Sequence, residues 1–244
     1  MNFTYESYEK LLQLFSDHGY SIADYENYHL FKRCVILRHD IDYDLNKALY
    51  LAKIESEMGV QSTYFILLTS DFYNLFSEHT NKAIAAIHGM GHHIGLHFDE
   101  KRYIKISGNI DRLRDKVIEE AECLRSAIGI PIKSVSMHRP SQEVISADMK
   151  IPGLINTYGK VFFKEFKYLS DSRRRWREAV EEIIKSEKFD KVQILTHAFW
   201  YNQEEMSLED SIRTFVNDGN MARYKLLQDN FTDLEGVMNR SKVR

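Results

Sequence analysis

Short strand-like runs alternate with helical stretches along most of this chain, and that alternation restricts the fold more than any other feature. Strands separated by helices pair in parallel, so the pattern predicts an α/β fold with a parallel sheet, either open or closed into a barrel. The strand-like runs lie at residues 35–40, 61–68, 92–98, 133–139, 155–159, 166–172 and 191–200. The helical stretches lie at residues 4–19, 45–59, 81–91, 109–129 and 175–187.

The chain is long and apolar enough to form one large domain. Of its 244 residues, 43% are hydrophobic and 12% are aromatic, which allows a substantial buried core. No internal repeat, low-complexity tract or proline-rich linker divides the sequence. We therefore expect a single domain over residues 1–244, with an N-terminal helical extension to about residue 33 and a C-terminal helical region from about residue 203.

Composition excludes several classes of protein. A net charge of −3 argues against a general nucleic-acid binder, which needs a basic surface. Cys34 and Cys123 are the only cysteines and form no CxxC pair, so neither a disulfide framework nor a cysteine zinc site is expected. The sequence contains no apolar run long enough to span a membrane, and its first residues do not resemble a signal peptide. We expect a cytoplasmic protein.

The stretch VILRHDID, residues 35–42, drives an apolar strand directly into a group of charged residues. In an extended chain Asp40 and Asp42 point to the same side, roughly 6.6 Å apart. Two carboxylates on one face repel each other. A bound cation would relieve that repulsion, and so would a salt bridge to Arg38 or to another arginine.

Four further strand-like runs also end in polar residues. The five segments are RHDID, LHFD, SMHRP, LSDS and LTHAFW, each at or just after the end of a run. In parallel α/β folds the carboxyl ends of the strands meet at one edge, where ligands bind and chemistry occurs. This convergence favours an enzyme.

The segment HHIGLHF contains three histidines, of which one is a candidate metal ligand. Gly91, Gly95 and the apolar neighbours favour an extended conformation, which places His93 and His97 roughly 13 Å apart. They cannot then bind the same metal, and only His97 reaches the carboxyl end of the run. His92 and His93 are expected to be structural, and the alternative for His97 is a hydrogen-bonded core histidine.

The segments RHDID, GHHIGLHFD, SMHRPS, SDSRRRW and LTH, in this order between residues 35 and 200, resemble the polysaccharide deacetylases of carbohydrate esterase family 4. The resemblance is strongest to the cytoplasmic branch associated with surface polysaccharides. It implies a distorted (β/α) barrel of mostly parallel strands that holds one divalent metal. It also implies hydrolysis of an N-acetyl group on a sugar, with one aspartate as general base and a late histidine as general acid.

The resemblance assigns the first catalytic and metal-binding roles, with one departure. Asp40 matches the general base, Asp42 the metal carboxylate and His97 the first metal histidine, although the family more often has its two aspartates adjacent. The second histidine of the family falls on Lys101, which has no lone pair while protonated. His138 is therefore our candidate for the third ligand, with Asp99 and His92 as the alternatives.

The remaining matches follow at the later strand ends. Arg139 matches the arginine that orients the catalytic aspartate, and His197 matches the general acid. Asp171, Trp176 and Leu195 match residues that line the substrate site.

The SDSRRRW segment adds a charged candidate. Arg173 belongs to a run of arginines at the start of the helix expected over 175–187, where cations oppose the helix dipole. An anionic partner such as a nucleotide- or lipid-linked diphosphate would explain the run, and a solvated surface is the alternative.

These residues suit amide hydrolysis, which needs a Lewis acid, a base for water and an acid for nitrogen. Two histidines and one aspartate favour Zn²⁺, with Co²⁺, Ni²⁺ and Fe²⁺ left open. The expected substrate is an N-acetylated sugar or sugar-containing precursor of a surface polysaccharide. Two alternatives remain: a non-catalytic carbohydrate-binding relative, and a metal-dependent hydrolase of a non-sugar amide. The sequence leaves the oligomeric state open.

Overall fold

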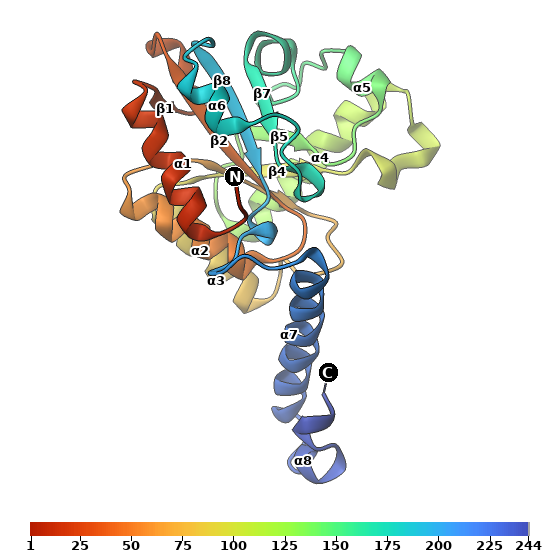
Figure 1. Ribbon diagram of the computed structural model, residues 1–244. Helices are drawn as coiled ribbons and strands as arrows, with labels where there is room; N and C mark the ends of the chain where they lie inside the picture. The colour runs from red at the N-terminus through yellow and green to blue at the C-terminus, as the bar shows by residue number, and fades with distance from the viewer. Residues whose placement is uncertain (244) are drawn as a thin grey trace. The chain divides into compact units, whose positions relative to one another are not determined.

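The computed structural model describes residues 1–243, and within them eight parallel strands form one sheet (Figure 1). The strand order is β6-β5-β4-β3-β2-β8-β7, and β1 also pairs with β2. The predicted α/β fold with a curled sheet of parallel strands is therefore confirmed. The strands are β1 Ser21–Ala23, β2 Cys34–Ile41, β3 Thr63–Leu67, β4 His93–Phe98, β5 Ser134–Met137, β6 Ile155–Asn156, β7 Lys167–Ser170 and β8 Lys191–Thr196.

Helices connect the strands and begin where capping side chains satisfy the first free backbone N–H groups. The oxygens of Thr4, Asp44, Ser77 and Asn109 cap four of these helices. The α-helices of this part of the chain are α1 Tyr5–Asp17, α2 Leu45–Glu57, α3 Glu78–Gly89, α4 Ile110–Ile128, α5 Gln142–Ser146 and α6 Val180–Lys185. Short helical turns are η1 Tyr28–Leu30, η2 Glu100–Ile106, η3 Val161–Glu165, η4 Ser172–Arg174 and η5 Ala198–Trp200.

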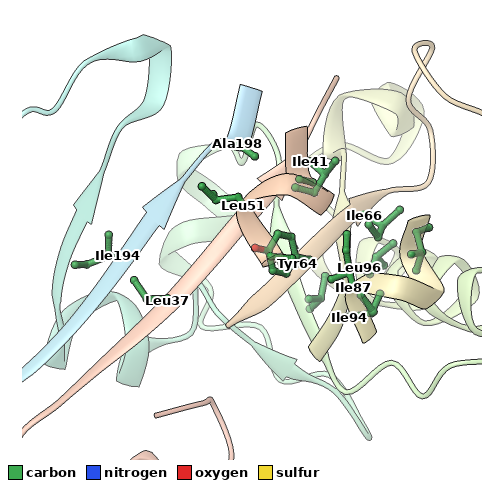
Figure 2. Close-up of a cluster of buried hydrophobic side chains, with 14 of the residues drawn as sticks. Leu37, Ile41, Leu51, Tyr64, Ile66, Ile87, Ile94, Leu96, Ile194 and Ala198 are labelled. Carbon is green, nitrogen blue, oxygen red and sulfur yellow. The ribbon is translucent and has the colours of Figure 1, made fainter. Parts of the chain in front are cut away.

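Strand β2 lies at the centre of the sheet and is buried along its whole length. It pairs with β8 on one side, while β1 and β3 share the other side. Its outward side chains join the main apolar core between the sheet and the helices. Figure 2 shows this core, in which Leu37 and Ile66 of the sheet belong to the same cluster as Leu51 of α2 and Ile87 of α3.

The sheet is strongly curled, because side chains connect strands that are far apart in the strand order. Arg38 of β2 donates a hydrogen bond to Thr157, just beyond β6, at 2.8 Å. Those two strands are four positions apart, about 19 Å in a flat sheet, which no side chain spans. At the two edges the rings of Tyr158 and Tyr168 lie 6.4 Å apart. The strands therefore form an incomplete barrel that side chains close.

A second, smaller apolar cluster fills the inner side of the curled sheet. Ile36 of β2 and Phe65 of β3 contact aromatic residues of η3 and of the N-terminal segment there. Gly95 of β4 pairs with Phe65 in the register, and a Cβ at this glycine would lie 2.4 Å from the Phe65 ring. Only glycine leaves room for the aromatic filling at this position.

Two expectations about chain organisation need revision or qualification. The helix expected over 175–187 spans only Val180–Lys185, since Arg175 and Ala179 are extended, and the backbone before it turns through left-handed conformations at Arg173 and Arg174, with φ of 61° and 55°. The argument that these arginines oppose a helix dipole is therefore wrong. The chain also separates into two compact units, one of Met1–Gln203 and one that begins at Glu204, and the single domain stays a prediction.

The second unit is helical. It contains α7 Leu208–Gln228, α8 Leu234–Val237 and the short turn η6 Arg240–Lys242. Tyr224 of α7 is buried, and its hydroxyl lies 2.8 Å from both Glu235 Oε2 and the Met238 carbonyl, which share its one proton and hold α8 against α7. Within residues 1–243, no helix is long and apolar enough to cross a membrane.

A buried polar network connects β2 to the helices on the outer side of the sheet. Glu55 of α2 is fully buried and accepts hydrogen bonds from four side chains. The donors are Tyr8, His39, Ser62 and Tyr64. Because every one of these groups is desolvated, loss of the carboxylate would leave them without a charged partner.

We expect Glu55→Gln to destabilise the fold in a pH-dependent way. Burial alone would raise the pKa of Glu55, but His39 and Ser62 lower it from its ordinary 4.5 to about 2. The carboxylate therefore stabilises the folded state above pH 4.5, and this contribution is lost as the pH falls toward 2. At about 1.4 kcal/mol per pKa unit, the variant should be less stable by about 3 kcal/mol near neutrality.

Urea unfolding at several pH values measures this difference. The matched control is Glu57→Gln, on an exposed position of the same helix, which should change stability little at any pH. A Glu55→Gln difference that stays constant from neutral to acid pH would contradict the electrostatic origin.

Candidate metal centre

The polar side chains predicted at the strand ends meet at the carboxyl edge of the curled sheet. Asp42 follows β2, His97 lies near the end of β4, His138 follows β5 and His197 follows β8. The sequence separates these residues widely, and the parallel register brings them together. Asp40 of β2 lies beside them on the inner side of the sheet, with its Oδ2 3.7 Å from His97 Nε2.

Asp42, His97 and His138 form a compact group, called here the Asp-His-His cluster, whose ligand atoms lie within 4.8 Å of one another. His97 Nε2 is 3.3 Å from Asp42 Oδ1 and 3.1 Å from His138 Nδ1. His138 Nδ1 is 3.2 Å from the same carboxylate oxygen. Ligands at about 2.0–2.1 Å from a tetrahedral Zn²⁺ are about 3.3 Å apart, so these separations suit one such ion.

Hydrogen bonding fixes the tautomer of His97. Ser136 donates its hydroxyl proton to Asp40 Oδ1 at 3.1 Å and accepts from Arg38 Nη2 at 2.8 Å. The Ser136 hydroxyl can then only accept from His97 Nδ1, which lies 2.8 Å away. The ring proton of neutral His97 is therefore on Nδ1, and the Nε2 lone pair faces Asp42 and His138, as metal binding requires.

Asp42 has the properties of a metal carboxylate. Its Oδ1 is buried and accepts no well-aligned hydrogen bond from the residues that the structure describes. Burial would raise the pKa of Asp42, but the neighbouring His138 and His97 rings hold it well below its usual range. An ionised, buried oxygen without a satisfied hydrogen bond is costly unless a cation is close. The donor set and its geometry therefore fit a divalent metal ion.

Asp40 is paired with a buried arginine from its own strand. Arg38 Nη2 donates to Asp40 Oδ2 at 2.8 Å, and both side chains are almost completely buried. Burial would raise the pKa of Asp40, but the Arg38 guanidinium, with His97 and His197 nearby, lowers it below its ordinary value. Asp40 is thereby kept ionised beside the Asp-His-His cluster.

Arg139 does not take the position that the sequence analysis gave it. It pairs with Asp99 and remains half exposed, and the guanidinium beside Asp40 belongs to Arg38. The reason is geometric. Arg38 and Asp40 are two residues apart on β2, so they share one face of that strand, whereas Arg139 lies beyond the end of β5. The expected orientation of Asp40 by Arg139 is therefore corrected to Arg38.

His197 lies beside Asp42 of the cluster and is held by a carboxylate. Its Nδ1 lies 2.6 Å from Asp171 Oδ1, and its Nε2 lies 3.9 Å from Asp42 Oδ2. Asp171 is completely buried and also accepts the backbone N–H of His197. Burial lowers the pKa of the His197 imidazole, but the carboxylates of Asp171, Asp42 and Asp40 together raise it to about 9.

The other residues named from the sequence differ in burial. Leu195 is buried in β8, in register with Arg38 and Ser170. Trp176 is partly buried against the main core, and Arg173 is exposed on the loop after β7.

His92, kept as an alternative third ligand, lies outside the cluster, as do His93 and Lys101. His92 is buried between the Ser62 backbone N–H and the Ala52 carbonyl. His93 is partly exposed beside Asp24, at 3.3 Å. Lys101 is exposed and its backbone N–H donates to Asp99.

Sequence reasoning missed two residues that organise the centre. Ser136 connects His97, Asp40 and Arg38, yet in the sequence it is an ordinary serine within a strand. Thr157 binds the second terminal nitrogen of Arg38 from beyond β6. The one available signal was position: Ser136 lies two residues before His138, and so on the same face of an extended strand.

Comparison with known proteins identified solved structures only, since neither a family model nor a curated protein matches the sequence. A CE4 family pseudoenzyme from Bacillus anthracis is similar over 78% of this chain, with 13% identity and a TM-score of 0.44, and the chain spans 60% of its length. The catalytic domain of peptidoglycan N-acetylglucosamine deacetylase from Eubacterium rectale is similar over 76% of this chain and 83% of its own length, with 14% identity and a TM-score of 0.44. A family 4 carbohydrate esterase from Bacillus anthracis covers 88% of this chain and 86% of its own, with 15% identity and a TM-score of 0.40.

Removal of either histidine of the Asp-His-His cluster should abolish tight metal binding. We expect His97→Ala and His138→Ala to weaken Zn²⁺ affinity by more than about 100-fold, because one carboxylate and one imidazole remain. His93→Ala and Lys101→Ala are the controls and should retain the metal. Calorimetric titration of metal-stripped protein measures all four variants, and full affinity in folded His138→Ala protein would remove His138 from the site.

Ser136→Ala should weaken metal binding without removing a ligand. The variant loses the acceptor that holds the His97 proton on Nδ1, so we expect a loss of about 10- to 100-fold in Zn²⁺ affinity. The matched control is Ser134→Ala, which removes a buried hydroxyl two residues earlier on the same face of β5. Equal affinities in the two variants would show that Ser136 does not orient His97.

Proposed function

We propose that this protein is a metal-dependent hydrolase that removes an N-acetyl group from a sugar or sugar-containing precursor. The observation that carries the proposal is the arrangement of two proton-transfer groups around the Asp-His-His cluster. Asp40 lies 3.7 Å from His97, and His197 lies 3.9 Å from Asp42. Amide hydrolysis needs a base for water and an acid for the leaving nitrogen, placed on either side of the reacting carbon.

Asp42, His97 and His138 are the residues that would hold the metal. When bound, a divalent ion supplies a Lewis acid that polarises the amide carbonyl and makes water more acidic. Mixed nitrogen and oxygen donors of this kind favour Zn²⁺, and Co²⁺, Ni²⁺ and Fe²⁺ accept the same set.

Asp40 is proposed as the general base. Its Oδ2 accepts from Arg38 and its Oδ1 accepts from Ser136, so the carboxylate is held in one orientation with its charge intact. Both oxygens keep a further lone pair. Because the side chain is rigidly held, proton transfer requires no rearrangement of the carboxylate.

His197 is proposed as the general acid. Asp171 binds its Nδ1 and thereby leaves Nε2 as the nitrogen that faces the centre. A buried carboxylate in this position orients an imidazole and stabilises its protonated form, as in other acid–base pairs. The Nε2 proton would be donated to the amine that leaves the substrate.

Exposed aromatic rings in the loop after β3 support a sugar substrate. A hollow of about 510 Å³ lies in the loop after β3, with exposed Phe72 and Phe76 at its surface. Ser70 of this loop donates to the Asp42 carbonyl, which places the hollow next to the cluster. Aromatic rings of this kind stack against sugar rings.

We propose that Arg173 binds a nucleotide- or lipid-linked diphosphate and that the product enters a surface polysaccharide made in the cytoplasm.

We expect Asp40→Asn and His197→Ala each to reduce deacetylation by at least about 1,000-fold while the metal remains bound, because each removes one proton-transfer group. Acetate release from N-acetylated sugars and elemental analysis measure the two properties. Asp190→Asn, an exposed change before β8, is the control and should be fully active. Turnover near the native rate in either variant would overturn its assigned role, and metal-loaded native protein that releases no acetate from any N-acetyl sugar would overturn the proposed reaction.

A further inference from the structure

Exposed cations gather on the two connections that lead from β4 to α4 and from β7 to α6. Both connections begin at the carboxyl edge of the sheet, because β4 and β7 are parallel and end there. Several of their lysines and arginines are exposed and make no ion pair within residues 1–243. We call these side chains the basic rim, which consists of Lys101, Lys105, Arg173, Arg175 and Arg177.

The carboxylates of the same two connections do not neutralise the basic rim. Each carboxylate in residues 99–109 and 171–179 has a partner outside the rim. The pairs are Asp99 with Arg139, Glu100 with the backbone N–H of Ser141, Asp171 with His197, and Glu178 with Lys167. Positive charge is therefore unmatched on these connections, although the whole chain has a net charge of −3. An anionic partner would match it.

The turn after β7 keeps its arginines apart. Arg173 and Arg174 both adopt left-handed conformations, with φ of 61° and 55°, which are uncommon for residues other than glycine. Arg174 lies over the Phe3 ring, with its guanidinium carbon 5.5 Å from the ring centroid, while Arg173 and Arg175 stay exposed. Unusual backbone of this kind is more frequent where a segment binds a partner than in ordinary loops.

An apolar side chain protrudes from the segment that carries the two lysines of the basic rim. Ile104 of η2 lies between them in the sequence and is 79% exposed. A soluble polyanion would bind the cations but gain nothing from the isoleucine. An anionic lipid layer accommodates both, since its headgroups attract lysine and arginine while an apolar side chain enters the boundary of the acyl chains. The combination therefore favours a membrane surface.

We propose that the basic rim docks this protein on an anionic membrane surface, with Ile104 inserted among the lipids. The Asp-His-His cluster lies at the same edge of the sheet, so docking brings the centre to the headgroup layer, where the diphosphate of a lipid-linked sugar would lie. The docking does not depend on the reaction. The choice of a lipid-linked over a nucleotide-linked substrate rests on the proposed function.

Co-sedimentation of the full chain with vesicles tests the docking. We expect binding to phosphatidylcholine vesicles that contain phosphatidylglycerol, a decrease in that binding as salt is added, and no binding to pure phosphatidylcholine. The measurement needs no turnover, so its outcome is independent of whether acetate is released. No binding to the anionic vesicles at low salt, or equal binding to both kinds of vesicle, would overturn the proposal.

Two matched triple variants separate a localised surface from net charge. Lys101→Gln, Lys105→Gln and Arg175→Gln together should lower the vesicle partition coefficient by at least about 10-fold, because each cation adds to the attraction. The control changes the net charge equally at exposed lysines outside the rim, and consists of Lys32→Gln, Lys53→Gln and Lys164→Gln. Circular dichroism checks that both variants are folded. Equal losses of binding in the two variants would contradict a docking surface at the carboxyl edge.

An isoleucine variant separates a lipid layer from a soluble polyanion. Ile104→Ser should lower vesicle binding by at least about 3-fold, whereas Leu30→Ser, at a 71% exposed position before β2, should leave it unchanged. Heparin serves as the soluble polyanion, and its binding should not respond to Ile104→Ser. Native protein that binds heparin at least as tightly as vesicles, with no effect of Ile104→Ser on vesicle binding, would identify a soluble anion as the occupant and refute membrane docking.

Discussion

The buried charge of Arg38 is the interaction on which the curled sheet and its centre depend. A guanidinium removed from water is costly unless its hydrogen bonds and its charge are matched. Asp40 supplies the charge, Ser136 and Thr157 accept further hydrogen bonds, and the Phe65 and Tyr158 rings lie 5.3 and 5.0 Å from the guanidinium carbon. Because Ser136, Thr157 and Tyr158 come from distant strands, they can reach Arg38 only when the sheet is curled. The same contacts keep Asp40 ionised and, through Ser136, orient His97.

Strand β2 organises the molecule because both of its faces are buried and both are polar near its end. Arg38 and Asp40 face inward, and His39 between them faces the helices, where it binds Glu55 and Thr196. The outer network thus joins the strand that carries Asp40 to α2 and to β8, which carries His197. A centre whose side chains must stay within a few tenths of an ångström gains this rigidity from the layer behind it.

Local sequence patterns predicted the features that follow from the direction of the strands. They failed for features that depend on contacts between residues far apart in the chain. The strand ends predicted that Asp42, His97 and His138 lie close together, since parallel strands bring their carboxyl ends to one edge whatever the barrel's curvature. Arg38 is two residues before Asp40, so the strand period allowed their pairing, whereas the role given to Arg139 came from the family resemblance and not from the local pattern. The helix expected over 175–187 begins only at Val180 despite a helical composition, after the left-handed turns at Arg173 and Arg174.

The separation of the two aspartates by Ile41 follows from the same geometry. On an extended strand, adjacent carboxylates would point to opposite sides, and one of them would enter the apolar layer beneath the helices. With Ile41 between them, both Asp40 and Asp42 face inward, while Ile41 itself packs into the main core at 2% exposure. The two carboxylates then differ by their neighbours: Arg38 and Ser136 satisfy Asp40, and the Oδ1 of Asp42 faces two imidazoles and no well-aligned donor. That difference, produced by one intervening apolar residue, suits Asp40 to proton transfer and Asp42 to a cation.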